Sequence, residues 1–522
     1  METVAAVQLR NITKRFGKVV ANNSVSLDIN RGEILSLLGE NGSGKTTLMN
    51  MLAGIYFPDE GEILVNGQPV TIASPKDAFN YGIGMIHQHF KLVDVFTAAE
   101  NIVLGLEDEG KLDLKAAASK IKGICEKYGF QIDPNKKIYD MSVSEKQTVE
   151  IVKVLYRGAD ILILDEPTAV LTPQETDRLF DVMRNMKTDG KAMIIITHKL
   201  HEVMDVSDRV AVLRKGKYIG DVATKDTSPQ ALTDMMVGHA VTLNIHRPDP
   251  KDPTPRLEVS GLTVYDAMGV KRLDNVTFTA MGGEILGIAG IAGSGQKELL
   301  ESVAGLQPIS PGASIRYRPI GHPEEKDGIE LVGKTPLQIK QSGVSLAFVP
   351  EDRLGMGLVG TMGMTGNMLL RSYRKGHGVF TDRKSPKKLA EEVLTELDVV
   401  TPGVNFPVRR LSGGNVQKVL VGREIAQEPS VLMTAYAVRG LDINTSYTIY
   451  NLLTEQKLKG VAVVYVGEDL DVLLELCDRI LVIGSGRVTG IVDARTATKE
   501  QIGLLMTKSA AAAVEKEGEQ NG

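Results

Sequence analysis

Two glycine-rich loops of one design occur in the two halves of this 522-residue chain. The first loop, GENGSGKT from Gly39 to Thr46, fits the pattern G-x-x-x-x-G-K-[ST], whose backbone N–H groups surround phosphate oxygens. In this pattern Lys45 reaches the outer phosphates and the Thr46 hydroxyl binds Mg²⁺. The second loop, GIAGSGQK, keeps the glycines but has Gln296 in the place of Lys45. The first half therefore predicts phosphate chemistry, and the second half has lost part of it.

A pair of carboxylates follows an apolar run in the first half. Asp165 and Glu166 end the sequence ILILDE, which is typical of a buried strand. Asp165 is suited to hold Mg²⁺, and Glu166 to orient an attacking water or accept its proton. A solvated acidic pair at a strand end would explain neither the apolar run nor the phosphate loop upstream. The pair and the loop together predict hydrolysis of a nucleoside triphosphate.

Two polar residues end other strand-like runs in the same half. His198 follows IIIT, and Gln88 follows GMIH. Each could reach the γ-phosphate from a strand next to the one that carries the carboxylates. Taken alone, each is more often an ordinary polar residue of the surface or core.

The elements that position these residues are expected to be strands alternating with helices. The expected strands are 33–38, 161–164, 193–197, 284–289 and 461–466, which are apolar and rich in β-branched residues. An amphipathic helix within a helical insertion is predicted by apolar residues at helical spacing, namely Leu114, Ala118, Ile121, Cys125 and Tyr128. Each half is therefore predicted to be an α/β domain with a mostly parallel sheet covered by helices.

The second half repeats the first in one register. Asp165 aligns with Ala435 and His198 with Glu468 at the same spacing, as a duplicated unit would give. The predicted domains are 4–240 and 257–507. Residues 241–256 are predicted to be a linker, because four prolines between positions 246 and 255 favour an extended connector over helix or sheet. Residues 508–522 have too little apolar surface to pack and are expected to form a flexible tail.

Composition excludes several classes of function. A net charge of -5 disfavours broad binding to nucleic acid or anionic lipid, and no apolar run approaches the ~18 to 20 residues that span a bilayer. The N-terminus lacks the basic and apolar regions of a secretion signal. Cys125 and Cys477 lie in helix-like stretches and are expected to be reduced core thiols of a cytosolic protein. Any membrane partner would have to be a protein.

The order of these motifs resembles the ATP-binding cassette ATPase family, twice over in one chain. The second half adds Leu411-Ser-Gly-Gly-Asn415, which is similar to the family's signature LSGGQ, whereas the first half has Met141-Ser-Val-Ser-Glu145 at the equivalent place. The resemblance implies two tandem P-loop domains, each with a parallel core, an antiparallel β-subdomain and the helical insertion. It also implies that the signature of one cassette closes over ATP and Mg²⁺ held by the phosphate loop of the other.

The resemblance assigns residues to two composite sites. Site one takes its catalytic residues Lys45, Gln88, Glu166 and His198 from the first half, and its metal ligands are Thr46, Gln88 and Asp165. Its nucleotide-binding residues are Phe16, which would stack on adenine, together with Gly39, Asn41, Gly42, Ser43, Gly44, Lys45, Thr46, Thr47, Gln88, Asp165, Ser412, Gly413, Gly414 and Asn415. A core aromatic remains the alternative for Phe16.

Site two is eroded at nearly every position. The second half has Gln296 and Lys297 in its loop, Ala435 and Tyr436 for the carboxylates, Glu468 for the histidine and Glu351 for the glutamine. Lys297 is expected to point roughly 100° away from the direction of the missing lysine, since it is one residue later on the helix. Ser144 and Glu145 of the first half complete this site, and Glu145 brings a carboxylate where phosphate would bind. One hydrolytic site and one inactive site are predicted.

A tandem cassette without membrane spans resembles the ATPases of importers for ribose, xylose, galactose or nucleosides. Val349-Pro-Glu-Asp-Arg353 and Glu468-Asp-Leu-Asp471 are similar to that subgroup, and Ile86 to Val93 is more similar to its nucleoside-type members. This implies two membrane permease subunits, an extracellular solute-binding protein, and a peripheral place at the cytoplasmic face of a bacterial plasma membrane. The alternative is a soluble tandem-cassette ATPase that acts on ribosomes, although such proteins typically keep both sites intact.

Overall fold

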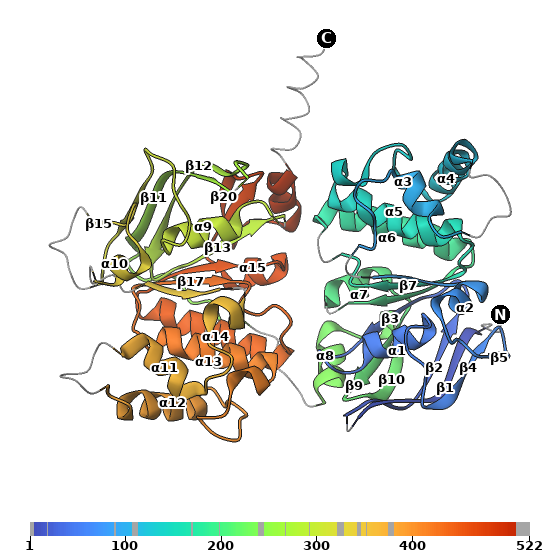
Figure 1. Ribbon diagram of the computed structural model, residues 1–522, viewed down its shortest axis with the longest axis horizontal. Coiled ribbons are helices and arrows are strands. Elements are labelled where there is room, and N and C mark those ends of the chain that lie inside the picture. The colour runs from blue at the N-terminus through green and yellow to red at the C-terminus, as the bar shows by residue number, and fades with distance from the viewer. Residues whose placement is uncertain are drawn as a thin grey trace, which may run out of the picture. The chain divides into compact units, whose positions relative to one another are not determined.

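The computed structural model divides the chain into two units, Met1–Leu243 and Asn244–Gly522, each with cores of its own (Figure 1). The structure describes residues 5–17, 19–87, 90–106, 113–168, 171–197, 199–238, 245–266, 268–291, 293–320, 328–341, 346–350, 352–373 and 381–507. Gln88, His198 and Glu351, three of the residues singled out from the sequence, lie outside these ranges.

The first unit is built on a six-stranded sheet of order β10-β9-β3-β8-β7-β6. Its strands are β3 (Ile34–Leu38), β6 (Ile83–Ile86), β7 (Ile161–Asp165), β8 (Ala192–Ile196), β9 (Arg209–Arg214) and β10 (Lys217–Ala223). All neighbours pair in parallel except β9 and β10. The carboxyl ends of β3, β6, β7 and β8 therefore meet at one edge, which is where open α/β sheets place their ligand sites.

A second, antiparallel sheet of order β2-β1-β4-β5 completes the unit. Its strands are β1 (Ala5–Phe16), β2 (Val19–Asn30), β4 (Glu60–Val65) and β5 (Gln68–Val70). The helices are α1 (Lys45–Leu52), α2 (Pro75–Asn80), α3 (Ala98–Val103), α4 (Leu114–Tyr128), α5 (Val143–Tyr156), α6 (Pro173–Thr188), α7 (Leu200–Val206) and α8 (Pro229–Val237). The amphipathic helix predicted from Leu114 to Tyr128 is confirmed as α4. None of the helices in the described part of the chain has the length and apolar character needed to cross a membrane.

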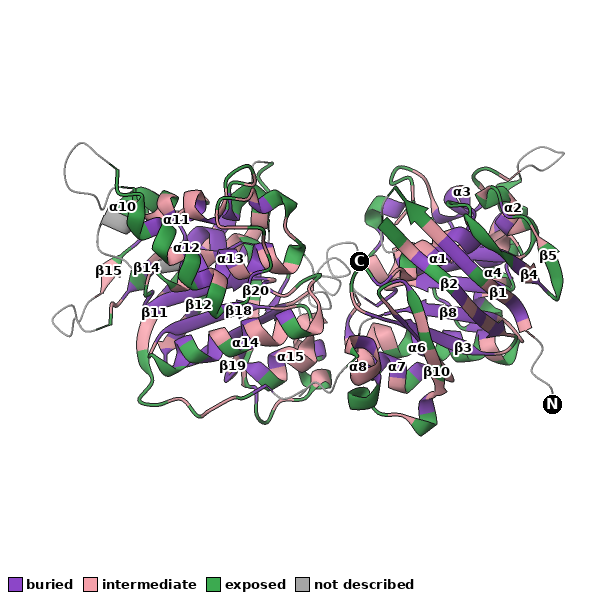
Figure 2. Cartoon of the chain, turned by 90° about the horizontal axis from the view of Figure 1, so that it is seen from below, coloured by how far each residue is buried: buried purple, intermediate pink, exposed green. Residues whose placement is uncertain are grey.

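Both faces of the parallel sheet are buried, as the purple strands of Figure 2 show. Alternate residues of one strand belong to different cores: Ile161 and Ile163 pack with the antiparallel sheet and α1, whereas Leu162 and Leu164 pack with the helices of the insertion. Burial on both faces explains why the strand runs are continuously apolar and do not alternate. Several helices start at a Ser or Thr whose side chain accepts a backbone N–H, such as Thr97, Ser142 and Thr172.

The second unit repeats this plan with sheets of order β12-β11-β14-β15 and β16-β17-β18-β13-β19-β20. The strands are β11 (Thr254–Tyr265), β12 (Lys271–Gly282), β13 (Ile285–Gly290), β14 (Ser314–Tyr317), β15 (Ile329–Glu330), β16 (Leu346–Val349), β17 (Val431–Ala435), β18 (Ala462–Val466), β19 (Arg479–Gly484) and β20 (Arg487–Asp493). The helices are α9 (Gln296–Val303), α10 (Pro336–Gln341), α11 (Met364–Ser372), α12 (Lys384–Glu396), α13 (Gly413–Ile425), α14 (Ile443–Leu458) and α15 (Leu470–Leu476). The predicted fold, two tandem cassettes with mixed sheets, is confirmed.

The proline-rich segment differs from the expectation of a connector that avoids sheet. The strand β11 begins at Thr254 and pairs Pro255 with Met281, so the last of the four prolines lies at the start of a strand, where proline is tolerated. The segment before it is packed on the second unit. Ile245 is buried in its core, and Arg247 donates to the carbonyls of Leu474 and Cys477, both at 2.7 Å. The core and backbone carbonyls of the second domain thus hold a stretch that composition alone assigns to the linker.

The two cysteines are core residues, as predicted. Cys125 and Cys477 are both buried and unpaired, and burial raises the pKa of the Cys125 thiol to about 11. Neither thiol is therefore activated for chemistry.

Candidate active site

The glycines of the first loop are required by backbone geometry. The loop joins β3 to α1, and Gly44, the residue before the helix, has φ 97°. A Cβ at Gly44 would lie 2.4 Å from the carbonyl oxygen of Ala21 and 2.6 Å from the Asn22 amide. The loop therefore has no room for a larger residue there. The N–H groups of the loop lie at the N-terminus of α1, a position that favours an anion.

The side chain of Lys45 folds back onto its own loop. Its Nζ donates to the carbonyl oxygens of Gly39 at 2.6 Å and Glu40 at 3.1 Å. Burial lowers the pKa of Lys45, while the nearby carboxylates of Glu166, Asp165 and Glu40 act in the opposite direction. Phosphate oxygens could replace the two carbonyls as acceptors. The Lys45 ammonium would then bind a negatively charged acceptor in place of two neutral ones, which makes the hydrogen bonds stronger.

The carboxylate pair stands at the end of β7, facing the loop. Asp165 is the last residue of the strand, and Glu166 has a left-handed backbone with φ 48°, fixed by its N–H donating to the carbonyl of Ile196 at 2.8 Å. A cavity of about 270 Å³ joins the pair to the loop. Its lining residues are Asn41, Gly42, Ser43, Gly44, Lys45, Thr46, Thr47, Asp165, Glu166 and Ile196. The structure thus brings together most first-half residues predicted for the site.

The donors around this cavity fit a phosphate and a magnesium ion. Ser43 is buried, lines the cavity, and its hydroxyl has no hydrogen-bond partner among the described residues. Thr46 and Asp165 offer the oxygen ligands that Mg²⁺ prefers. In the described ranges, no three His, Cys, Asp or Glu side chains are grouped so that they could hold a metal ion. The hydroxyl of Thr46 and the carboxylate of Asp165 fit an ion whose other ligands are phosphate oxygens.

Asp165 gives the site a predicted pH dependence. Burial, helped by the charge of Glu166 and opposed by Lys45, raises the pKa of Asp165 to about 6. Since a metal ligand must be deprotonated, protons compete with Mg²⁺ below that pH, and the apparent Mg²⁺ affinity should fall by up to about tenfold per pH unit. Mg²⁺ titrations with a fluorescent ATP analogue between pH 5 and 7.5 measure this. Asp165→Asn should show only the nucleotide's own pH dependence; the same slope in both proteins would contradict the assignment.

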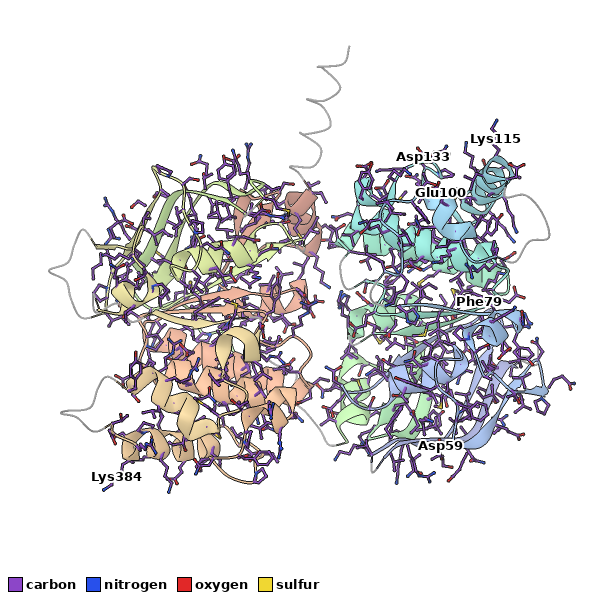
Figure 3. All side chains as sticks on the ribbon, viewed as in Figure 1. Asp59, Phe79, Glu100, Lys115, Asp133 and Lys384 are labelled. Atoms are coloured by element: carbon purple, nitrogen blue, oxygen red, sulfur yellow. The ribbon has the colours of Figure 1, made fainter. Side chains whose placement is uncertain are left out.

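Phe16 is exposed, as a stacking ring must be and a core aromatic is not. It ends β1 with 44% of its surface accessible. Its ring centroid lies 5.2 Å from that of Tyr56 in a T-shaped arrangement, and the Lys14 ammonium lies 5.6 Å from the Phe16 centroid. Asp59, labelled in Figure 3, holds Lys14 at 3.0 Å. The alternative of a core aromatic is therefore wrong.

The signature of the second half forms an open helix N-terminus. Ser412 caps α13, and Asn415 donates from its Nδ2 to the Ser412 hydroxyl at 2.9 Å. Ser412 and Gly413 are exposed. A Cβ at Gly413 would come within 3.3 Å of Arg353, and one at Gly414 within 3.2 Å of Thr445. Both glycines therefore lie in tight places, although Ser412 and Gly413 stay exposed at the start of the helix.

The equivalent helix of the first half is closed by its own carboxylate. Glu145 accepts the Ser142 N–H at 2.7 Å and the Lys136 ammonium at 2.8 and 2.9 Å. Burial raises the pKa of Glu145, but Lys136 and the Ser142 N–H outweigh it, so that the pKa lies below its usual value. The Glu145 carboxylate thus stays ionised at the start of this helix, where it accepts the Ser142 N–H and pairs with Lys136.

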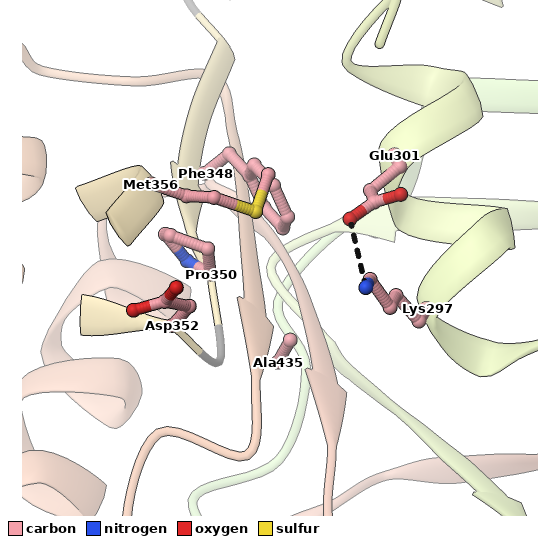
Figure 4. Close-up of a pocket in the computed structure, with 7 residues that line it drawn as sticks. All are labelled: Lys297, Glu301, Phe348, Pro350, Asp352, Met356 and Ala435. Atoms are coloured by element: carbon pink, nitrogen blue, oxygen red, sulfur yellow. Dashed lines mark ion pairs between the residues drawn. The ribbon is translucent and has the colours of Figure 1, made fainter. Parts of the chain in front are cut away.

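The loop of the second half keeps its shape without its charge. Gln296 donates to the carbonyl of Ile291 at 3.1 Å, as Lys45 does to its own loop, and Lys297 turns to Glu301 at 3.8 Å with 62% of its side chain exposed. Figure 4 shows the Lys297–Glu301 ion pair at a cavity of about 260 Å³. Its lining residues are Lys297, Glu301, Phe348, Pro350, Asp352, Met356 and Ala435. Oxygen ligands for a metal have given way to apolar groups and an internal ion pair.

One residue that contacts the first loop was not found from the sequence. Asn22 of β2 is fully buried and donates to the carbonyl of Gly44 at 3.2 Å, which braces the loop from the antiparallel sheet. In the second half Leu273 stands at the corresponding contact, 2.5 Å from a Cβ placed on Gly295. A buried asparagine in a strand is a weak signal, because its partner becomes known only when the two sheets are placed.

Comparison with known proteins agrees with this geometry. The family described as ABC transporter matches residues 22–169. The chain is 42% identical to the nucleoside import ATP-binding protein NupA of Lactococcus lactis and to the guanosine import ATP-binding protein NupO of Bacillus subtilis. These alignments cover 97% and 96% of this chain and 99% and 97% of the relatives. It is 39% identical to the glucose import ATP-binding protein TsgD13 of Haloferax volcanii, over 96% of this chain and 95% of the relative.

Among solved structures, an ATP-binding cassette of an ABC transporter in its ADP conformation covers 45% of this chain and 100% of its own, at 25% identity and a TM-score of 0.41. The identity to full-length relatives decides the class: the chain belongs to the ATP-binding proteins of the ABC transporter family, which are ATPases. The resemblance inferred from the motifs is thereby confirmed.

Proposed function

We propose that this chain is the ATP-hydrolysing subunit of an importer for nucleosides or simple sugars, with one competent and one inactive site. The competent site combines the phosphate loop and carboxylates of the first half with the signature of the second. The observation that carries this proposal is the sorting of losses: the cavity at Lys45 and Asp165 retains its polar groups, and so does the helix start at Ser412. At the counterparts, Ala435 stands in the place of the Asp165 carboxylate, and Glu145 occupies the helix start with its own carboxylate.

The residues of this site divide the reaction among them. Lys45 and the N–H groups of the loop bind the β- and γ-phosphates, and Phe16 stacks on the adenine. Bound at Thr46, Asp165 and Gln88, Mg²⁺ would neutralise charge on the phosphates. Glu166 orients the attacking water and accepts its proton, while His198 and the N–H groups at Ser412 to Asn415 contact the γ-phosphate. ATP binding closes the two halves, and hydrolysis reopens them.

The solute is proposed to be a nucleoside. The support is the higher identity to the nucleoside and guanosine import proteins than to the glucose import protein, together with the sequence from Ile86 to Val93. Radiolabelled uptake in cells that lack this chain tests it. Uptake of nucleosides should be lost and that of ribose, xylose and galactose kept. If uptake of pentoses or galactose is lost and uptake of nucleosides is kept, the solute is a sugar and the nucleoside proposal is wrong.

The partners are proposed to be two permease subunits in the plasma membrane, served from outside by a solute-binding protein, with this chain at the cytoplasmic face. The docking segment follows Gln88 and extends to about Asn101. Asn101 is fully buried and fixes this segment by accepting the Val93 N–H at 2.7 Å and donating to the Val93 carbonyl at 3.1 Å. Val95, on the loop so fixed, is 64% exposed. A rigid loop with an exposed apolar tip is suited to a protein partner.

Val95→Asp is expected to uncouple transport from hydrolysis. A charge at a buried interface anchor should lower uptake by about tenfold or more. The basal ATPase rate of the purified chain should stay within a factor of about two, because Val95 does not line the cavity. Leu458→Asp is the control, because Leu458 is an apolar residue at the end of α14 with 54% of its surface exposed. Parallel loss of uptake and basal hydrolysis would place the docking segment elsewhere.

The alternative of a ribosome-acting ATPase has less support. The relatives reported above are all named as import ATP-binding proteins, and the alignments cover nearly their full lengths. Co-purification with membrane subunits rather than co-sedimentation with ribosomes is the expected result.

A further inference from the structure

A buried carboxylate outside the predicted site joins the ends of two catalytic strands. Glu202, in the first turn of α7, has 2% of its surface exposed. It accepts hydrogen bonds from the hydroxyl of Thr168 at 2.6 and 2.7 Å and from that of Thr197 at 3.2 Å. The Lys199 ammonium lies 3.0 Å away and neutralises it. A carboxylate so deeply buried is stable only with such a complete set of partners.

The partners of Glu202 flank the residues assigned to hydrolysis. Thr168 is two residues after Glu166 in the turn that follows β7, and Thr197 directly follows the end of β8. The Lys199 ammonium also donates to the carbonyl of Thr168 at 3.2 Å, and the Lys199 N–H donates to the Thr197 hydroxyl at 3.1 Å. The network therefore links the turn after one strand to the end of the next.

This link acts on a turn that is already fixed at its other end. The Glu166 N–H donates to the carbonyl of Ile196, and Glu166 itself has the left-handed backbone that residues with side chains seldom adopt. The Thr168–Glu202–Thr197 bridge lies immediately beyond. The turn that carries the Glu166 carboxylate is thus held to β8 at two successive points.

The second half shows that the fold does not need this network. The residues at the equivalent positions, in the register that aligns Asp165 with Ala435, are Val438, Gly467, Asp469 and Val472. Val472 cannot accept the hydrogen bonds that Glu202 accepts. Tyr436 nevertheless keeps the left-handed turn, with φ 52° and its N–H on the carbonyl of Val466 at 3.0 Å. The network is absent in the half whose hydrolytic groups are absent.

We propose that Glu202 is a positioning residue for hydrolysis, which acts by holding the turn of Glu166 against β8. The inference rests on the proposed function, since it assumes that Glu166 acts on the attacking water. A turn fixed at two points keeps the carboxylate in one place when nucleotide enters, and such preorganisation lowers the barrier of the chemical step without adding to nucleotide binding.

The test compares Glu202→Gln with a matched buried glutamate. Glu202→Gln should lower kcat by about tenfold or more, since ~1 Å of misplacement can cost up to about 100-fold, and leave the Kd for a fluorescent ATP analogue within about twofold. Glu33→Gln is the control: Glu33 is buried and bound by Arg209 at 2.7 Å, but it precedes β3 at the opposite edge of the sheet. Glu33→Gln should lower Tm and keep kcat. Thr168→Val, which copies Val438, is a second variant that decides the matter if Glu202→Gln does not fold.

Glu166→Gln separates failure of this inference from failure of the proposed function. In a Glu166→Gln background, Glu202→Gln should cost no further activity, because it acts through Glu166. If Glu166→Gln abolishes turnover but Glu202→Gln and Thr168→Val keep the kcat of the Glu33→Gln control, the inference alone is overturned. If Glu166→Gln itself retains turnover, the proposed function falls and the inference with it.

Discussion

Glu166→Gln is expected to abolish most ATP turnover, by about 100-fold or more, because a glutamine of the same shape cannot accept the proton of the attacking water. The backbone should not change, since the left-handed turn depends on the N–H bond to Ile196 and not on the carboxylate. Steady-state phosphate release at saturating Mg²⁺ and ATP measures the effect. A binding measurement with the same variant should show nucleotide affinity near that of the unmodified protein.

Tyr436→Ala is the matched variant in the second half. Tyr436 occupies the equivalent turn, with its N–H on the carbonyl of Val466 and the Arg439 guanidinium 5.9 Å from its ring. It offers no carboxylate, so its loss should change the rate by no more than about twofold, the size of an ordinary surface effect. Equal losses in the two variants would show that both sites hydrolyse ATP, against the asymmetric account.

Lys45→Gln is the second large effect, and it copies the loop of the second half. Gln296 shows that a glutamine can hold such a loop, through its bond to the Ile291 carbonyl, so Lys45→Gln should keep the fold and remove only the charge. Loss of a preorganised cation that faces the transferring phosphate should cost about 100- to 1,000-fold in turnover. The rate of ATP hydrolysis, with Tm as a check on folding, measures it.

The reverse change, Gln296→Lys, should leave the rate within a factor of about two. Ala435 and Tyr436 still supply neither a metal ligand nor a base at that site, so a restored cation cannot restore turnover. A rise in activity with Gln296→Lys, or full activity with Lys45→Gln, would contradict the division into one competent and one inactive site.

Local patterns in the sequence were enough to predict the phosphate loops, the strands that precede them and the helix from Leu114 to Tyr128. Glycines with a positive φ, continuous apolar runs and helical spacing each act over a few residues, so their signal is readable before folding. The exposure of Phe16 also agrees with its expected role, since a ring that stacks on a ligand must be accessible.

Contacts between distant segments could not be predicted in this way. Asn22 lies in the antiparallel sheet and donates to Gly44 in the loop that follows β3 of the parallel sheet. Glu202 contacts Thr168 only because β7, which precedes Thr168, pairs with β8, which precedes α7. The packing of Ile245 and Arg247 on the second unit is likewise invisible in a proline-rich composition. Tertiary placement, and not residue type, gives each of these side chains its role.

The central claim is that the signature of the second half serves the phosphate loop of the first. It is tested most directly by exchanging the signatures. Gly414→Ser with Asn415→Glu gives the second half the residues of Ser144 and Glu145, and places a carboxylate on the helix start that should meet the γ-phosphate. The reverse pair, Ser144→Gly with Glu145→Asn, gives the first half the residues of Gly414 and Asn415.

The measurement is kcat for ATP hydrolysis by the two exchanged proteins. The first exchange should lower kcat by about 100-fold or more, as the loss of preorganised donors does, and the second should leave it within about twofold. Unchanged turnover in the first protein, or a large change in the second, would contradict the account.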